Sequence, residues 1–144
     1  MQKKLRKDIT FAYIKPENGM SNEDVIIKTI LENGFEIIEE KLYSFTLNDA
    51  EWLYRQHEGK DFFPTLIKFT CSAPVKILVL KKENAVQEWR NLIGDTKNPQ
   101  KGTIRARFAI ANPGHKNTVH GSDSDQNAME EICMFFSKLT YLFY

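Results

Sequence analysis

One histidine in this chain, His120, has neighbours that could make it a nucleophile. It ends a short apolar run and precedes Gly121, Ser122, Asp123 and Ser124. A neutral imidazole is nucleophilic near pH 7, because the unperturbed pKa of histidine is ~6.5. Gly121 leaves the ring sterically open, and the hydroxyls and the carboxylate that follow can orient it. These residues are the minimum set that a covalent phosphohistidine requires. A lone histidine beside a turn, however, is more often a surface or core residue.

The composition limits the class of protein. The chain has 144 residues and a formal net charge of +1, with 42% hydrophobic and 27% charged residues. These values are typical of one soluble globular domain, which we expect over residues 1–144. The near-neutral charge provides no overall attraction to nucleic acid or to an anionic membrane, so Arg and Lys must bind any anion locally. Cys71 and Cys133 are too few for a disulfide framework, and we expect two reduced, buried thiols.

The first seven residues are basic, as in the start of a signal peptide. The apolar run after them, residues 9–14, is too short for a signal peptide and ends at Lys15-Pro16. No run approaches the ~18 apolar residues that a membrane span needs. We therefore expect a cytoplasmic protein with no membrane partner.

Strand-like and helix-like segments alternate along the chain. We predict strands at residues 9–14, 35–45, 75–80 and 118–120, and helices at 21–33, 46–54, 62–70, 84–93 and 124–136. Thr46 and Asp49 form a capping pattern, and Gly94 closes the fourth helix. Residues 95–117 are predicted to be irregular. Without the accessory helices the order is βαββαβ, which indicates an α+β, ferredoxin-like fold with an antiparallel four-stranded sheet covered by helices.

Several motifs that would indicate other functions are missing. Gly59-Lys60 is followed by Asp61, so it does not continue as a phosphate-binding loop, and the chain has no G-x-G-x-x-G motif. No Cys/His cluster has zinc-ligand spacing. We interpret His57 and His115 as structural or solvent-facing, because neither has a partner at ligand spacing.

Four short motifs, by contrast, resemble those of the nucleoside diphosphate kinases. They are Tyr13-Ile14-Lys15-Pro16, Phe62-Phe63-Pro64, Gly102-Thr103-Ile104-Arg105 and the run from Asn117 to Ser124. They occur in that family's order over residues 9–136, and the second half of the set is highly specific. The resemblance implies a ferredoxin-like fold, in agreement with the order of elements. It also implies ping-pong transfer of the γ-phosphate between nucleotides through a phosphohistidine, with Mg²⁺ carried on the nucleotide.

The resemblance implies roles for individual residues. His120 would carry the phosphate, and Ser122 and Glu131 would orient the histidine. Lys15 would reach the transferred phosphate and a ribose hydroxyl. The nucleotide-binding residues would be Tyr54 beside the phosphates, Phe62 and Leu66 at the base, Arg90, Thr96 and Arg105 as a phosphate clamp, and Asn117 at the ribose. No metal-ligating residue is implied.

Two of these roles can be examined by helical periodicity. Ala128, Ile132 and Phe135 form the inward stripe of the last helix, and Glu131 falls at its edge while Glu130 points away. An inward carboxylate needs a polar partner, which favours Glu131 over Glu130. For Phe62, core packing remains the alternative, since either it or its neighbour Phe63 must face inward.

Some segments depart from the family's pattern. Arg105-Ala106-Arg107-Phe108 stands where Arg-Gly-Asp-Phe is usual, the chain is slightly shorter between Thr96 and Gly102, and it is slightly longer at residues 112–116. An apolar residue that contacts the base in relatives cannot be assigned there. These changes concern base affinity and subunit contacts. Every residue matched to the phosphate chemistry is present.

Two alternatives to the enzyme stay open. One is a nucleotide-binding regulatory homologue with little turnover, its loop remodelled around Arg107 and His115. The other is a nucleic-acid-binding module, which the near-neutral charge makes less favourable. Its basic patch would contain Lys97, Lys101, Arg105, Arg107 and Lys116.

The resemblance also implies an oligomer. We expect a homo-oligomer built from a robust dimer, with a hexamer favoured over a tetramer, acting on nucleoside di- and triphosphates. The last residues, 139–144, are strongly apolar. Exposed apolar segments of this kind usually mark a contact surface, so we predict that this tail is buried against the same or a neighbouring subunit.

Overall fold

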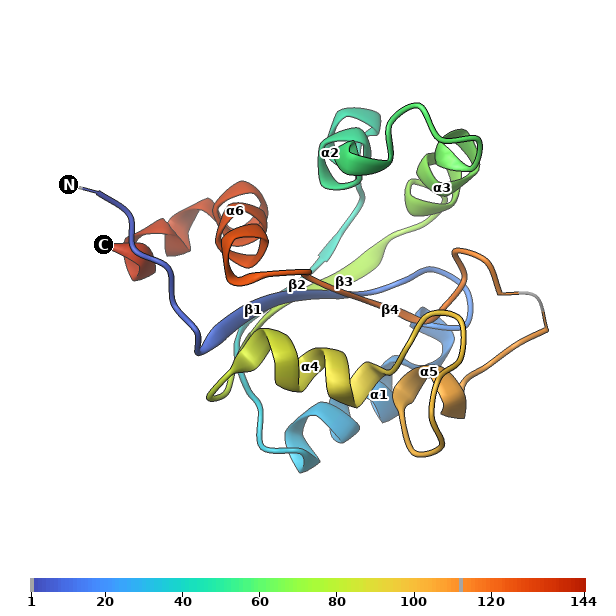
Figure 1. Ribbon diagram of the computed structural model, residues 1–144, viewed down its shortest axis with the longest axis horizontal. Helices are drawn as coiled ribbons and strands as arrows, with labels where there is room; N and C mark the ends of the chain where they lie inside the picture. Colours follow the sequence, from blue (N-terminus) through green and yellow to red (C-terminus); the bar gives the residue numbers. More distant parts are fainter. Residues whose placement is uncertain (1, 112) are drawn as a thin grey trace.

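The computed structural model describes residues 2–111 and 113–144, and its centre is one antiparallel sheet. The strands are β1 (Ile9–Ile14), β2 (Glu36–Tyr43), β3 (Val75–Lys81) and β4 (Val119–Gly121). They lie in the order β2-β3-β1-β4 (Figure 1). The helices are α1 (Glu23–Glu32), α2 (Leu47–Leu53), α3 (Phe63–Thr70), α4 (Ala85–Ile93), α5 (Ile104–Arg107) and α6 (Asp125–Phe135). This confirms the predicted ferredoxin-like plan.

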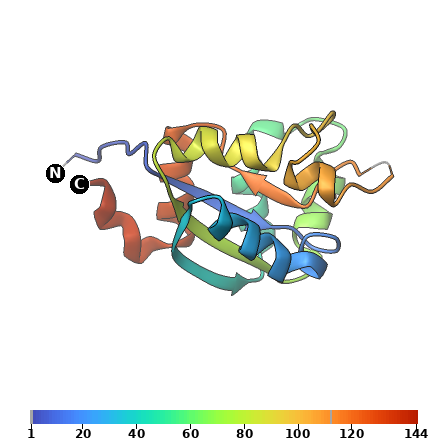
Figure 2. The same ribbon diagram turned by 90° about the horizontal axis from the view of Figure 1, so that it is seen from below.

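Strand β1 is buried along its whole length because helices cover both faces of the sheet. Its side chains alternate between the faces, as the pleat of a strand requires. Phe11 and Tyr13 pack in the layer that contains α2, α3 and α6, whereas Ala12 and Ile14 pack in the layer with α1, α4 and α5. Figure 2 shows α1 and α4 lying across the second face.

Local signals in the sequence explain several helix ends. Thr46 and Asp49 form the predicted capping box at the start of α2. Gly94 ends α4 with a φ of 89°, a conformation that favours glycine. The segment predicted to be irregular contains α5, where the Thr103 hydroxyl accepts a hydrogen bond from the Ala106 amide. A helix of one turn is too short to show hydrophobic periodicity, so the sequence did not reveal it.

Three short 3₁₀ helices complete the described elements: η1 (Met20–Asn22) before α1, η2 (Arg55–His57) after α2, and η3 (Ser137–Phe143) at the end of the chain. In η3, Leu139 and Phe143 are buried against the core of the same chain, while Tyr141 is 67% exposed and Tyr144 51% exposed. The tail is therefore only partly buried within this chain.

Both cysteines are free, as expected, but they are half-buried rather than buried. Cys71 lies at the C-terminal end of α3, where a helix end meets solvent. Among the described residues, no helix is both long and apolar enough to cross a membrane.

Candidate active site

A cavity of about 1150 Å³ opens at the carboxyl end of β1. All of the predicted site residues except Ser122 line it, namely Lys15, Tyr54, Phe62, Leu66, Arg90, Thr96, Arg105, Asn117, His120 and Glu131. Ser122 is buried behind the wall. The fold thus brings together residues from η2, α3, α4, α5, β4 and α6, with Lys15 directly after β1.

The imidazole of His120 is oriented by a carboxylate on α6. Its Nε2 lies 3.2 Å from Glu131 Oε1, which also accepts a 2.7 Å hydrogen bond from Ser122 Oγ. Glu131 is only 6% exposed, whereas Glu130 points outward and pairs with Arg55. A carboxylate beside Nε2 keeps the proton on that nitrogen and leaves the lone pair on Nδ1. The choice of Glu131 over Glu130 agrees with this geometry.

The backbone of β4 is held from the other face of the sheet. Trp89 Nε1 on α4 donates a 3.0 Å hydrogen bond to the carbonyl of His120. A Cβ at Gly121 would lie 2.9 Å from the same indole ring. The glycine therefore lets α4 pack directly on β4, a reason for its presence that the sequence alone does not provide.

Lys15 is a buried cation at the cavity wall. Its Nζ donates to Asn117 Oδ1 at 2.7 Å and to the carbonyl of His115 at 3.3 Å. Burial, with a smaller contribution from the charge of Arg105, lowers the pKa of Lys15 to about 7. The turn after this lysine is so tight that a Cβ at Gly19 would collide with the Lys15 carbonyl.

A strained residue lies just before the histidine strand. Thr118 has a φ of 79°, which β-branched residues rarely adopt and which costs about 1–3 kcal/mol. Its hydroxyl accepts a 2.9 Å hydrogen bond from the Asn18 amide, which also donates to the Phe108 carbonyl at 3.1 Å. The carbonyl of Thr118 accepts from the Lys15 amide at 2.9 Å. Asn18 thus holds the strained turn.

The two arginines at the cavity differ in their surroundings. Arg105 is largely buried, and its guanidinium donates to the carbonyls of Gly94, Asn117 and Val119 at 2.8–3.2 Å. Burial, followed by the charge of Arg90, lowers the pKa of Arg105 to about 10, so it remains a cation at neutral pH. Arg90 is exposed and pairs with Asp123 at 2.9 Å.

The far end of the cavity is lined by rings. Phe62 is 40% exposed, while Phe63 packs against the core, so the alternative of a core role for Phe62 does not hold. His57 lies 5.3 Å from Phe62 and His115 lies 5.4 Å from it, between ring centroids. Burial is the largest cause that lowers the pKa of both imidazoles. Both histidines thus line the cavity beside Phe62, a position that the lack of partners at ligand spacing did not reveal.

The lengthened segment contributes to this end of the cavity. Pro113, Gly114 and His115 line it, and Asn112 lies outside the described residues. Arg107 lies over the ring of Phe108, with 5.4 Å between the guanidinium carbon and the ring centroid. Since Arg105 is buried among carbonyls, it does not contribute to an exposed basic patch with Arg107.

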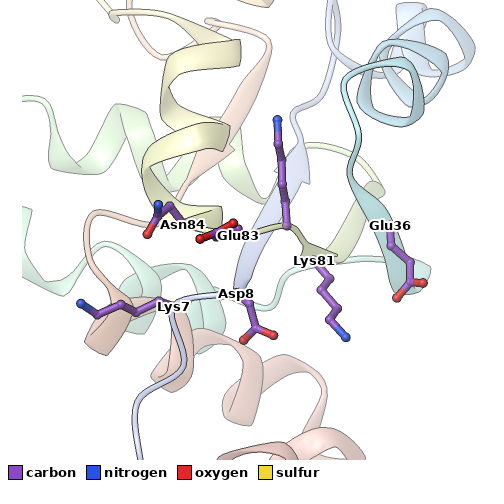
Figure 3. A pocket seen from close by; sticks show the side chains of 7 residues that line it. Lys7, Asp8, Glu36, Lys81, Glu83 and Asn84 are labelled. Carbon is purple, nitrogen blue, oxygen red and sulfur yellow. The ribbon is translucent and has the colours of Figure 1, made fainter.

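A second cavity, of about 540 Å³, lies near the opposite end of β1. Lys7, Asp8, Glu36, Lys81, Lys82, Glu83 and Asn84 line it. Their side chains point in several directions rather than toward one centre (Figure 3), and the charges of both signs offset one another. None of the predicted site residues lies there.

Comparisons with known proteins agree with the geometry of the first cavity. Residues 8–141 match the family model described as nucleoside diphosphate kinase. The chain belongs to this family. The nucleoside diphosphate kinase of Histophilus somni strain 2336 is 43% identical over 136 residues, which cover 90% of this chain and 92% of that protein. The enzyme of Pasteurella multocida strain Pm70 is 44% identical over 131 residues, 88% of this chain and 92% of its own length.

Solved structures from the family have the same fold. The nucleoside diphosphate kinase of Aquifex aeolicus superimposes with a TM-score of 0.84 at 32% identity, covering 92% of this chain and 97% of the other. That of Halobacterium salinarum, solved in complex with CDP, gives 0.83 at 27% identity, covering 96% and 99%.

Proposed function

We propose that this protein is an active nucleoside diphosphate kinase that works by ping-pong transfer through His120. The observation that carries the proposal is the Ser122–Glu131–His120 chain of contacts, which engages Nε2 of a histidine on the wall of a cavity lined by cations. A nucleophile oriented by a carboxylate is the arrangement that covalent catalysis needs.

In the first half-reaction, the Nδ1 lone pair attacks the γ-phosphorus of the donor. The bond from that phosphorus to the bridging oxygen breaks, and the nucleoside diphosphate leaves with the electron pair. The proton stays on Nε2, next to Glu131, so no separate base is required. In the second half-reaction, a terminal oxygen of another nucleoside diphosphate attacks the phosphorus and the P–N bond breaks.

The cations of the cavity would stabilise the charge on the transferred group. Lys15 and the guanidinium of Arg105 are already fixed by protein carbonyls and amides, so little reorganisation is needed. Arg90 would exchange its contact with Asp123 for a phosphate oxygen. Thr96 and Tyr54 complete this wall, and Asn117 would bind a ribose hydroxyl.

Magnesium would arrive with the nucleotide. Within residues 2–111 and 113–144, no group of three His, Cys, Asp or Glu side chains is arranged to hold a metal ion. Glu131 is engaged by Ser122, which leaves Asp95 and Asp123 as exposed carboxylates on the cavity wall. These residues fit an ion bound mainly by phosphate and water oxygens, where Mg²⁺ would neutralise phosphate charge.

The base would stack on Phe62, with Leu66 beside it. Stacking tolerates every base, because each has a π-face. Purine and pyrimidine diphosphates should therefore both be accepted, with larger bases somewhat favoured. Steady-state rates with ADP, GDP, CDP and UDP test this expectation, and a preference for one base by several orders of magnitude would contradict it.

Incubation with γ-labelled ATP tests the central proposal. The enzyme should acquire acid-labile, alkali-stable phosphate, and ADP should remove it. His120→Asn should fold normally and acquire none, because a side-chain amide is not nucleophilic. Nucleotide binding without label would instead support the regulatory homologue, and turnover by His120→Asn near the wild-type rate would overturn the choice of nucleophile.

We also propose a cytoplasmic homo-oligomer, with a hexamer favoured over a tetramer. Strand β2 lies at the edge of the sheet, and Leu42 on it is 62% exposed. An exposed edge strand with an apolar side chain is suited to pairing with a second chain. Light scattering on the wild type and on Leu42→Lys tests this. A wild-type monomer at micromolar concentration would refute the oligomer.

A further inference from the structure

A second aromatic ring on the central strand contacts the histidine directly. Tyr13 on β1 is the cross-strand partner of His120 on β4, and the two strands are neighbours in the sheet (Figure 1). Because cross-strand partners point to the same face, the two rings meet. Their centroids are 5.1 Å apart and their planes are inclined by 24°, a stacked arrangement. The Tyr13 side chain is 1% exposed.

Tyr13 is itself fixed from two further directions. Phe45 packs edge-on against it with the ring centroids 5.1 Å apart. The Tyr13 hydroxyl shares a 2.5 Å hydrogen bond with the hydroxyl of Tyr54, which lines the cavity. Burial raises the pKa of both phenols above the ordinary value, so both stay neutral. The histidine therefore rests on a rigid, uncharged and electron-rich ring.

The Tyr13 ring stacked on His120 affects the charge that develops in the proposed reaction. When Nδ1 bonds to phosphorus while Nε2 keeps its proton, the imidazole becomes a phosphoimidazolium and gains positive charge. A cation above an aromatic face is stabilised by the ring quadrupole, more strongly when both are desolvated. A neutral imidazole gains less from the same stack.

Resting on the proposed function, we propose that Tyr13 is a positioning residue that acts through His120. Its ring holds the imidazole plane so that Nδ1 faces the cavity, and it stabilises the phosphorylated ring relative to the free one. The stack therefore shifts the equilibrium between ATP plus free enzyme and ADP plus phosphoenzyme toward the phosphoenzyme.

The equilibrium itself is the readout that distinguishes this role from simple packing. Full-length protein would be mixed with labelled ATP, ADP and Mg²⁺ at several nucleotide ratios, and the phosphoenzyme fraction measured. Tyr13→Leu removes the ring and should lower the equilibrium constant by roughly 3- to 30-fold, the range of a desolvated cation–π contact. The rate of His120 phosphorylation should fall while the KM for ATP changes little.

Matched variants separate the stack from general damage to the core. Phe45→Leu removes a ring of similar size that contacts Tyr13 and lies outside the cavity lining, and it should keep the wild-type equilibrium. Tyr13→Phe keeps the stacked ring and should recover most of the phosphoenzyme lost in Tyr13→Leu. Should the leucine variant unfold, Tyr13→Met replaces it, because an unbranched side chain fills irregular gaps.

The outcomes distinguish the two proposals. Wild-type protein without label on His120 would overturn the proposed function and this inference together. A labelled wild type whose equilibrium is matched by Tyr13→Leu, or is lowered equally by Phe45→Leu, would overturn the role of Tyr13 alone. A lowered equilibrium in Tyr13→Leu only, restored by Tyr13→Phe, supports it.

Discussion

Under the proposed function the cavity has a phosphate end around His120 and a base end around Phe62, and the two ends are built differently. At the phosphate end, Lys15 and Arg105 donate hydrogen bonds to other parts of the chain, and Glu131 accepts one from Ser122. At the base end, Phe62 is 40% exposed and its neighbours His57 and His115 come from a 3₁₀ turn and a loop. The first end is preorganised and the second is adaptable.

This difference matches the task that the proposed function gives to each end. Phosphoryl transfer depends on fixed charges and on a correctly oriented nucleophile, so movement of the groups there costs rate. Recognition of several bases requires a face on which any ring can stack rather than a rigid set of hydrogen bonds. Substitutions at the phosphate end should therefore lower kcat, whereas those at the base end should change KM.

The largest effect should come from Arg105. Its guanidinium contacts three backbone carbonyls and lies on the cavity wall, so Arg105→Ala should lower kcat by about 100-fold or more and also lower the melting temperature. Arg107→Ala, in the same short helix but exposed, is the control and should retain both values. Kinetics and thermal melting measure the pair. A kcat for Arg105→Ala within threefold of wild type would contradict the comparison.

The next largest effect should distinguish two adjacent carboxylates, Glu131 and Glu130, by their influence on the phosphorylation rate. Glu131→Gln keeps the shape but removes the charge beside His120, so phosphorylation of His120 should slow about 10- to 100-fold, as expected for a lost hydrogen bond to a charged group. Glu130→Gln changes an exposed residue that pairs with Arg55 and should have little effect. Single-turnover labelling compares them. Equal rates in the two variants would show that Glu131 does not orient the nucleophile.

A smaller effect should appear in the pH dependence of binding. The pKa of Lys15 is about 7 in the free protein, against an ordinary value of 10.5. Bound phosphates favour the ammonium form of Lys15 and raise its pKa. At a pH between the pKa of the free protein and the higher pKa of the complex, binding therefore takes up a proton. Affinity for Mg·ADP should fall above pH 7, by up to about tenfold per pH unit.

Calorimetry at pH 8 in two buffers of different ionisation enthalpy measures that proton. Lys15→Arg is the control, because its guanidinium stays charged and should show no uptake. Binding by the wild type without proton uptake would mean that Lys15 is already charged in the free protein.

The smallest effects should occur at the base end. Phe62→Ala should raise the KM for nucleotides by about tenfold, the cost of one lost stacking contact, with kcat nearly unchanged. His115→Ala should raise KM by about threefold or less, since the loop that carries it can adapt. Initial rates over a range of ADP and CDP concentrations measure both. A large loss of kcat in either variant would remove the distinction between the two ends.

The sequence by itself determined the pattern of elements and the residues matched to the phosphate chemistry. Helical periodicity was enough to place Glu131 inward and Glu130 outward, and the capping box at Thr46 could be read directly. These features depend on residues within a few positions of one another. Such short-range patterns can be predicted from the sequence, because the geometry of a single helix or strand imposes them.

The tertiary structure decided the contacts between residues distant in sequence. His57 and His115 contact Phe62, and Tyr13 stacks on His120. Trp89 packs over Gly121, the residue after His120. Such contacts follow from the register of β1 against β4 and from how α4 packs on the sheet. No local pattern encodes them, because a single sequence does not reveal which distant segments become neighbours.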